Sequence, residues 1–357
     1  MSRLLLVIYP KTCSTKIAIF DNRKQTFLMN IKHSPEAFSN SKSFSDQYEY
    51  RKNAILDELR KSNIDSHLIK IIIGRGGLLK PMEGGVYKVS NTMLNDTLNP
   101  MVDHESNLGG MLAYGIAQET GQDIPSIIVD PACVDEMEEV FKISGFPEIP
   151  RRSILHTLNQ RTIARNFARE IGKNYEEINV IVANISQGIS VGAHKQGKII
   201  DVNNGLVGEG PMSTERSGGV PLGRLVEMCF SGKYTKQQIK CKLKGDGGAF
   251  AYIGSRNYIE IEKKIEDGDA YAALIFSAIA VQVAKEIAGL TASLKGQVDG
   301  ILITGELAHS NLLVTQITEM VSHLGTVRNY PGEEEMEALA MHGYMVLDGE
   351  IEMKEYI

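Results

Sequence analysis

The sequence predicts an α/β protein made of two halves that follow the same plan. Each half opens with three short strands in series, and the later strands of each half alternate with helices. Such alternation is typical of parallel strands joined by right-handed crossovers. The chain has 357 residues, of which 43% are hydrophobic and 23% charged, and this suits about two soluble domains with a core each. An internal duplication is the simplest account of the repeated plan.

In the first half, a continuous apolar run at 4–9 predicts a buried strand, and a polar loop is expected at 10–15. Two more strands are expected at 16–20 and 26–32, separated by the turn signal Asp21-Asn22. The residues that follow predict a helix at 47–61, a buried strand at 68–73, a helix that runs to about residue 120, and a short strand at 127–129.

The second half repeats this opening. Strands are expected at 178–184, 189–194 and 198–202, with a polar loop at 185–187 and a turn at Gln196-Gly197. A long helix at 270–294, a buried strand at 300–304, and helices at 312–324 and 334–347 follow. We expect two closely packed domains whose two polar loops face each other across a cleft, which is where small ligands usually bind.

Charge and composition exclude several classes of function. The net charge of −6 leaves no basic footprint for nucleic acid. The four cysteines are scattered without a CxxC pair, so neither a zinc site nor a disulfide framework is expected, and reduced thiols suit the cytosol. The apolar run at 4–9 is too short for a signal peptide, and no stretch approaches the ~18 apolar residues of a membrane span. We therefore expect a cytoplasmic protein with no membrane or nucleic-acid partner.

Two motifs in the first half follow or precede predicted elements. Gly74-Arg75-Gly76-Gly77 follows a strand, where glycines allow a sharp turn and arginine can bind a carboxylate or phosphate in bidentate fashion. His104 opens the segment HESNLGG, in which Ser106 or Asn107 would cap the following helix. The alternatives are a turn with a surface arginine and a helix cap without chemistry. The adjacent His-Glu pair lacks metal-ligand spacing.

Other candidates lie at strand ends and in glycine-rich segments. Asp130 ends a strand at the usual site edge of an α/β sheet, where it could contact Mg²⁺ or orient a nucleophile. The acidic run that follows it, 135–139, is interpreted as a solvated helix face. Arg216 lies in a segment rich in glycine, 208–219, and Gly305 stands between a strand and a helix, where helix N–H groups favour phosphate. The chain has no Walker A, GxGxxG, GxSxG or HExxH motif.

Eight segments, in order along nearly the whole chain, resemble the butyrate kinase family, close kin of acetate kinases in the actin-like ATPase superfamily. They are GRGGLLKPMEGGVY, HESNLGG, IIVDPACVDEMEEV, RRSILHTLNQ, GISVGAHKQGKIIDVNNGLVGEGP, ERSGGVP, LITGELAHS and PGEEEMEALA. The resemblance implies a duplicated actin-like (ribonuclease H-like) fold of two domains. The first would comprise 1–150 completed by the C-terminal helix 336–357, and the second 151–335.

The resemblance also implies reversible phosphoryl transfer between ATP and a short-chain carboxylate, butyrate or a branched acid, to give an acyl phosphate and ADP. Arg75 and Arg216 would hold the carboxylate and the phosphoryl group, His104 would stabilise charge, and Asp130 would position substrate or metal. Glu335, or Glu334, would hold Mg²⁺. A homodimer or larger oligomer is expected by analogy. The resemblance assigns nucleotide binding to Lys11, Ser14, Thr15, Lys16, Asn184, Gly188, Gly305 and Glu306.

The chain departs from the family pattern at three phosphate or nucleotide elements. The family's NPGSTSTK is YPKTCSTK from Tyr9, its HLGGG is NISQG from Asn184, and its TGG is Thr304-Gly305-Glu306. Glutamine adds bulk where a backbone must come close, and glutamate adds negative charge, while Lys11 adds a positive charge. Two hypotheses follow: a working kinase with altered nucleotide use, or a catalytically weak paralogue that binds an acyl phosphate, acid or nucleotide. Sugar kinases and Hsp70-like proteins, a third alternative, lack the ERSG and HESNLGG segments.

Overall fold

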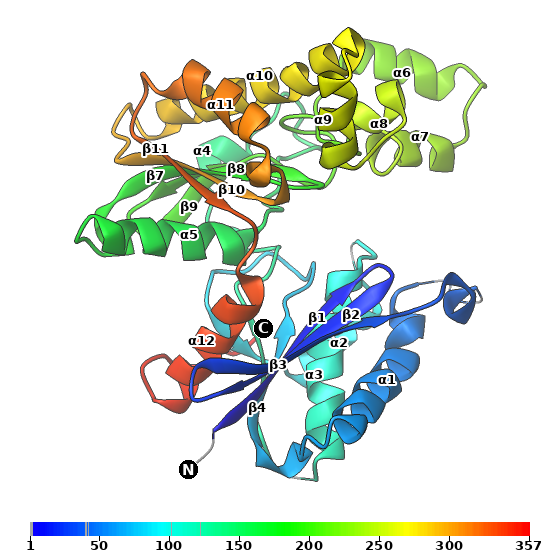
Figure 1. Ribbon diagram of the computed structural model, residues 1–357, viewed down its shortest axis with the longest axis vertical. Helices are drawn as coiled ribbons and strands as arrows, with labels where there is room; N and C mark the ends of the chain where they lie inside the picture. The colour runs from blue at the N-terminus through cyan, green and yellow to red at the C-terminus, as the bar shows by residue number, and fades with distance from the viewer. Residues whose placement is uncertain (1–2, 40, 42, 101, 122) are drawn as a thin grey trace. The chain divides into compact units, whose positions relative to one another are not determined.

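The computed structural model describes the chain except for residues 1, 2, 40, 42, 101 and 122. The chain forms two compact units (Figure 1), one of residues Met1–Val134 with Glu334–Ile357 and the other of Asp135–Glu333. The domain division expected at 150/151 and 335/336 stays a prediction.

The first unit contains a mixed sheet of six strands in the order β3-β2-β1-β4-β6-β5. The first three form an antiparallel meander, β4 and β6 continue it in parallel, and β5 pairs antiparallel with β6 at the edge. The strands are β1 (Leu4–Lys11), β2 (Ser14–Asp21), β3 (Lys24–Lys32), β4 (Ile69–Arg75), β5 (Val86–Lys88) and β6 (Ser126–Val129).

The second unit repeats this plan in a sheet of five strands, in the order β11-β10-β7-β8-β9. Its meander is again antiparallel, and β10 and β11 continue it in parallel from β7. The predicted α/β class with a duplicated meander is therefore confirmed. The strands are β7 (Asn179–Ile185), β8 (Ile189–Lys195), β9 (Lys198–Val202), β10 (Gly300–Gly305) and β11 (Val327–Pro331).

Helices cover both faces of the first sheet. Helices α1 (Tyr48–Lys61) and α3 (Leu108–Glu119) pack with β1 and β4 in an apolar core, and Figure 1 shows them together on one side of the sheet. Helix α12 (Glu335–Leu347), from the end of the chain, packs against β1 and β4. A Cβ on Gly343 in α12 would be 2.6 Å from the Ile73 side chain, so this glycine lets the helix approach the strands. Helix α2 (Asn91–Leu98) completes the unit.

In the second unit, α10 (Ala270–Ser293) and α11 (Asn311–Val321) cover one face of the sheet, and α5 (Thr157–Glu170) covers the other. By length and composition alone α10 could cross a membrane, which the expectation from the sequence overlooked. Its residues Phe276, Ile279 and Val283 have no exposed surface and belong to the main core. The remaining helices are α4 (Glu139–Lys142), α6 (Leu222–Phe230), α7 (Lys236–Leu243), α8 (Gly248–Ile253) and α9 (Tyr258–Glu266).

Two expectations about local structure, at 10–15 and 135–139, were wrong, and two strands were missed. The polar loop at 10–15 is mostly strand, and only Thr12-Cys13 connects β1 to β2. Strands β5 and β11 were not expected, because β5 has three residues and β11 has mostly exposed side chains, so neither carries a long apolar run.

The acidic run 135–139 is not a solvated helix face, because helix α4 begins only at Glu139. The Glu136 carboxylate is buried against the Arg161 guanidinium, with both oxygens 2.5–2.6 Å from Nη2. It also accepts a hydrogen bond from the backbone N–H of Ile199 at 3.0 Å. This residue therefore ties the segment before α4 to α5 and β9.

Candidate active site

In the first unit, the glycines around Arg75 allow three segments to meet. A Cβ on Gly74 would be 2.1 Å from the backbone oxygen of Gly109, and one on Gly76 would be 2.5 Å from Pro131 Cβ. A Cβ on Gly77 would be 2.6 Å from Asn107 Oδ1, and none of these glycines has a positive φ. They serve close packing rather than the sharp turn that the sequence suggested. The result brings the segments of the predicted residues Arg75, His104 and Asp130 side by side.

The Arg75 side chain lies between an aromatic ring and a carboxylate. Its Cζ is 4.3 Å from the centre of the Tyr9 ring, and its Nε is 4.0 Å from Glu335 Oε2. Only 20% of the Arg75 side chain and 7% of the Glu335 side chain are exposed. A cation over a ring face and beside a carboxylate is held in one orientation. Tyr9, which departs from the family pattern, therefore supports a residue that keeps it.

His104 caps a 3₁₀ turn, Glu105–Asn107, before α3. Its Nδ1 accepts a hydrogen bond from the Ser106 backbone N–H at 3.2 Å, so in the neutral ring the proton is on Nε2, 3.5 Å from Glu105 Oε2. Of the two expected capping residues, Asn107 stands at the N-cap position of α3, but its side chain makes no capping hydrogen bond. The Asn107 side chain instead accepts from the backbone N–H of Leu78 at 2.7 Å, which anchors the segment after Arg75.

Asp130 lies at the end of β6 with φ of 38°, a region that residues other than glycine rarely adopt. Its Oδ1 accepts from the Gly85 backbone N–H at 2.8 Å, and its own N–H donates to the Gly85 carbonyl at 2.9 Å. The side chain is 3% exposed. Such strain is often found at functional sites, and here the two bonds to Gly85 hold the residue in place.

The hairpin tip between β1 and β2 is anchored from inside by Arg51 of α1, which has no exposed surface. Its guanidinium donates to the Lys11 and Ser14 carbonyls at 2.9 Å, the Thr12 carbonyl at 2.8 Å and Thr15 Oγ1 at 3.0 Å. Thr15 is fully buried, so its hydroxyl serves this internal network. Lys11 is exposed, and Ser14 and Lys16 are half-buried. The tip is therefore a short, rigid hairpin.

In the second unit, the turn between β7 and β8 is Ser186-Gln187-Gly188, closed by the pair Ile185 and Ile189. A Cβ on Gly188 would be 2.2 Å from Arg216 Nη1. The same nitrogen donates to the Gly205 carbonyl. Gly188, the glycine of this loop that agrees with the family pattern, thus makes room for Arg216. Two residues that the sequence singled out separately lie in contact.

Ser186 joins the two altered motifs of this unit. Its Oγ accepts from the Glu306 backbone N–H at 3.1 Å and lies 3.0 Å from Asn184 Oδ1 and 2.8 Å from Glu333 Oε1. Gly305 has φ of 99°, and a Cβ there would be 2.6 Å from Ser186 Oγ. The predicted residues Asn184, Gly305 and Glu306 therefore meet at the carboxyl edge of the sheet.

The three consecutive glutamates before and in α12 have different surroundings. Glu333 contacts Ser186, Glu334 is exposed, and Glu335 is buried beside Arg75. Within the described part of the chain, no three His, Cys, Asp or Glu side chains gather in a way that could hold a metal ion. A magnesium ion needs only one or two carboxylates when substrate phosphates supply the other ligands. Glu335 or Glu334 fits that requirement.

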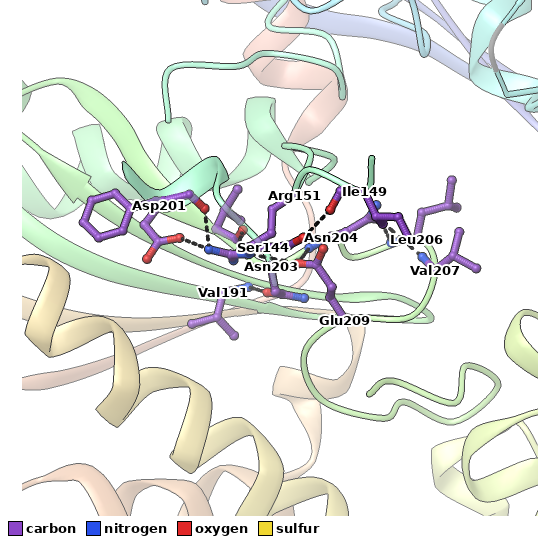
Figure 2. A network of polar contacts seen from close by, with 12 residues as sticks. Ser144, Ile149, Arg151, Val191, Asp201, Asn203, Asn204, Leu206, Val207 and Glu209 are labelled. Carbon is purple, nitrogen blue, oxygen red and sulfur yellow. Dashed lines mark hydrogen bonds and ion pairs between the residues drawn. The ribbon is translucent and has the colours of Figure 1, made fainter. Parts of the chain in front are cut away.

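The first part of the glycine-rich segment is held by Arg151 (Figure 2). Glu209 Oε2 accepts from the Asn204 backbone N–H at 3.1 Å and lies 3.5 Å from Arg151 Nε. Arg151 Nη1 donates to Asp201 Oδ1 at 3.0 Å, at the end of β9. Glu209 therefore has a structural partner, whereas Arg216, later in the segment, contacts the β7–β8 turn.

His156 is a candidate that the sequence reasoning missed. It stands at the N-cap of α5, is half-buried, and has Nδ1 2.9 Å from Ser190 Oγ in β8. The Gly205 N–H donates to the Ile154 carbonyl at 2.9 Å, and the Gly205 carbonyl accepts from Arg216. Gly205 thus links Arg216 to Ile154, two residues before His156. The sequence contained a signal for this residue, because His156 stands in RRSILHTLNQ, a segment that supported the family resemblance but from which no site residue was taken.

Comparisons with known proteins agree with this architecture. A model of the acetokinase family matches residues 149–335, more than half of the chain. An acetate kinase from Porphyromonas gingivalis has 16% identity and a TM-score of 0.77, with 97% of this chain and 100% of that chain covered. An acetate kinase from Entamoeba histolytica has 13% identity and a TM-score of 0.77, with coverages of 96% and 99%.

A propionate kinase from Francisella tularensis subsp. tularensis SCHU S4 has 16% identity and a TM-score of 0.74, with coverages of 94% and 98%. These likenesses show the fold, and a ROK family protein from Streptococcus pneumoniae TIGR4 shares it more distantly, with a TM-score of 0.51. The predicted actin-like class is confirmed. By its sequence match and its fold, the chain belongs to the acetokinase family.

Proposed function

We propose that this acetokinase-family chain is a short-chain fatty acid kinase of the butyrate kinase type. It would transfer the γ-phosphoryl group of ATP to butyrate or a branched short-chain acid, giving an acyl phosphate and ADP, and catalyse the reverse reaction. The contact of Arg216 with Gly188 carries the proposal. Through this contact a guanidinium lies at the turn that corresponds to the phosphate loop of the family. The structural neighbours named above as acetate and propionate kinases support a carboxylate substrate.

In the forward step a carboxylate oxygen forms a bond to the γ-phosphorus as the bond to the ADP oxygen breaks. Arg75 and Arg216 would hold the carboxylate and the phosphoryl oxygens, since arginine matches both in bidentate geometry. His104, and His156 with it, would donate hydrogen bonds to developing negative charge, and Asp130 would position the substrate. Mg²⁺ on Glu335 or Glu334, when bound, neutralises charge on the phosphates.

Nucleotide-binding residues are proposed in each unit by itself. Lys11, Ser14 and Lys16 of the first hairpin would offer charge and hydrogen bonds, and Thr15 would act through the shape of the hairpin. From the second unit we propose Asn184, Gly188, Gly305 and Glu306. Asn184 supports this, because it has no exposed surface and its amide Nδ2 has no hydrogen-bond partner among the described residues. A buried polar atom of this kind gains from a ligand.

A second candidate is a catalytically weak paralogue that binds an acid, acyl phosphate or nucleotide. One observation favours it: Ser186 already accepts the Glu306 backbone N–H, a donor that a phosphate at this strand–helix junction would need. The exposed Glu306 side chain adds negative charge at the same place. Nucleotide binding separates the two candidates, since a bound ligand raises the melting temperature by mass action.

The deciding experiment is acyl phosphate formation from butyrate with Mg-ATP, trapped with hydroxylamine. Arg216→Ala should abolish the product. Arg224→Ala, a surface change on α6 where the arginine side chain is 83% exposed, should leave it unchanged. Melting curves of both variants establish that they are folded. No product from the wild type with several acids and nucleotides would overturn the kinase and favour the paralogue.

We also propose a cytoplasmic location and a homodimer or larger assembly, from the family resemblance. Light scattering coupled to gel filtration measures the assembly, and a monomer at working concentrations contradicts it. Acids from acetate to isovalerate, compared by kcat/KM, measure the chain-length preference, for which one methylene is worth about 1–3 kcal/mol.

A further inference from the structure

A row of polar side chains runs between β8 and α5 and ends at His156. Ser190, Gly192 and His194 alternate along β8 and therefore share one face of the strand. His156 is the N-cap residue of α5, and Gln160 lies one turn into the helix, where its backbone N–H donates to the His156 carbonyl at 2.9 Å. A Cβ on Gly192 would be 2.6 Å from Gln160 Oε1. This glycine leaves the space in which the row fits.

The orientation of the Gln160 amide follows from a backbone carbonyl. One Gln160 amide atom is 3.0 Å from the Ser190 carbonyl oxygen, which can only accept, so this atom is the nitrogen. Gln160 Oε1 then faces His194 Nε2 at 3.0 Å, and Nε2 must carry a proton. Burial lowers the pKa of His194 to about 3, so its ring is neutral and Nδ1 accepts from Tyr175 Oη at 2.7 Å.

The Ser190 hydroxyl transmits this orientation to His156. Ser190 has no exposed surface, so its proton needs an acceptor within the protein. Its oxygen accepts from Gln160 Nε2 at 2.9 Å and from the His156 backbone N–H at 3.4 Å. The remaining contact is with His156 Nδ1 at 2.9 Å. The hydroxyl therefore donates to Nδ1, and the proton of the neutral His156 ring is on Nε2.

We propose that Ser190 and Gln160 are positioning residues that hold His156 in the tautomer with its proton on Nε2. His156 then presents an N–H donor, the group that an anionic phosphoryl oxygen requires. This use of the donor rests on the proposed kinase function, whereas the tautomer does not. The row extends to His194 and Tyr175, but the Ser190 carbonyl sets the direction of every bond in it.

The tautomer can be measured without any assay of activity. Protein labelled with ¹⁵N in its histidine rings is examined by long-range ¹H–¹⁵N correlation spectra, with the His156 signals assigned from His156→Gln. We expect a protonated Nε2 and an unprotonated Nδ1 in the wild type. Ser190→Ala and Gln160→Met should give a mixture of tautomers. Tyr175→Phe and the control Ser293→Ala, which removes a hydroxyl bonded to Asp201, should leave His156 unchanged.

A wild-type His156 with its proton on Nδ1 overturns the proposal. So does an unchanged single tautomer in Gln160→Met, the variant that keeps the side-chain volume. In a working kinase, Gln160→Met should lower kcat about 10- to 100-fold with little change in KM for ATP. A wild type with the expected tautomer and no kinase activity would support the positioning role and overturn the proposed function.

Discussion

The Arg75 guanidinium lies 4.3 Å from the centre of the Tyr9 ring and 4.0 Å from Glu335 Oε2. Tyr9 is one of the residues at which the chain departs from the butyrate kinase pattern, and Arg75 is one that it keeps. The departure thus supports the retained residue, because the ring face and the carboxylate together restrict the guanidinium. The hairpin that carries the altered residues therefore makes a contact of its own, between Tyr9 and Arg75.

Replacing Arg75 by lysine should lower kcat/KM for the carboxylate about 100-fold or more, since a point charge cannot reproduce two parallel hydrogen bonds. Steady-state kinetics with butyrate and ATP measure the effect. Arg60→Lys is the matched control, because the Arg60 side chain is 73% exposed on α1. Equal losses in both variants would contradict a specific role for Arg75.

Arg51→Met should destabilise the first unit by about 3–5 kcal/mol. The change leaves the carbonyls of Lys11, Thr12 and Ser14 without the donor that they share, and buried groups left unsatisfied cost about 1–3 kcal/mol each. Urea unfolding followed by circular dichroism gives the free energy, with Arg60→Met as the control. A loss below about 1 kcal/mol would mean that water replaces the guanidinium at little cost.

Gly188→Ala should reduce activity. The new Cβ would stand 2.2 Å from Arg216 Nη1 and 2.5 Å from the Gly205 carbonyl oxygen, so the side chain proposed to hold substrate and the backbone at Gly205 must both shift. We expect kcat/KM to fall about 10- to 100-fold, as for other small misplacements of catalytic groups. Gly289→Ala in α10, where a Cβ would meet nothing within 4 Å, is the control. Its activity should be unchanged, and a helical alanine favours stability by up to about 1 kcal/mol.

Restoring the family residues at two positions should strengthen nucleotide binding. Ser186→Gly frees the Glu306 backbone N–H, and Glu306→Gly removes a negative charge near the phosphates. The shift in melting temperature with Mg-ATP measures binding for each variant and for the pair. Because the two residues share a hydrogen bond, their effects should not add. Additive effects, or weaker binding in the double variant, would show that the contact does not limit nucleotide access.

Stability should fall as the pH drops below about 6.5. Burial, aided by Arg51, lowers the pKa of His33 to about 4, and burial lowers the pKa of His194 to about 3. Both rings are neutral in the folded chain but take up protons in the unfolded chain below about 6.5. The unfolded state therefore binds more protons. Each histidine lowers the free energy of unfolding by about 1.4 kcal/mol for each pH unit below this value.

Urea unfolding between pH 7 and pH 5 measures this slope. His33→Gln should reduce it by the contribution of one proton, because the replacement does not titrate. His323→Gln, at an exposed position in the second unit, should leave the slope unchanged. The same slope in wild type and His33→Gln would mean that His33 gains its proton in the folded state as readily as in the unfolded one.

Much of the secondary structure could be predicted from local patterns. Strand β9 has the predicted bounds 198–202, and helix α10 ends one residue before the prediction, because both are rich in apolar residues. Edge elements could not be found this way. Strand β11 pairs with β10 through its backbone, while its side chains are mostly exposed, so nothing in its residue pattern marks it.

The sequence by itself determined the α/β class, the repeated meander and membership of the acetokinase family, since these depend on hydrophobic periodicity and on residues read in order. Only the tertiary structure decided what the motif residues do. Gly188 makes room for Arg216, Tyr9 supports Arg75, and Ser190 orients His156. Each of these relations joins residues at least 28 positions apart. Local pattern carries no information about such pairs, because packing of strands and helices, and not sequence spacing, sets the distance between them.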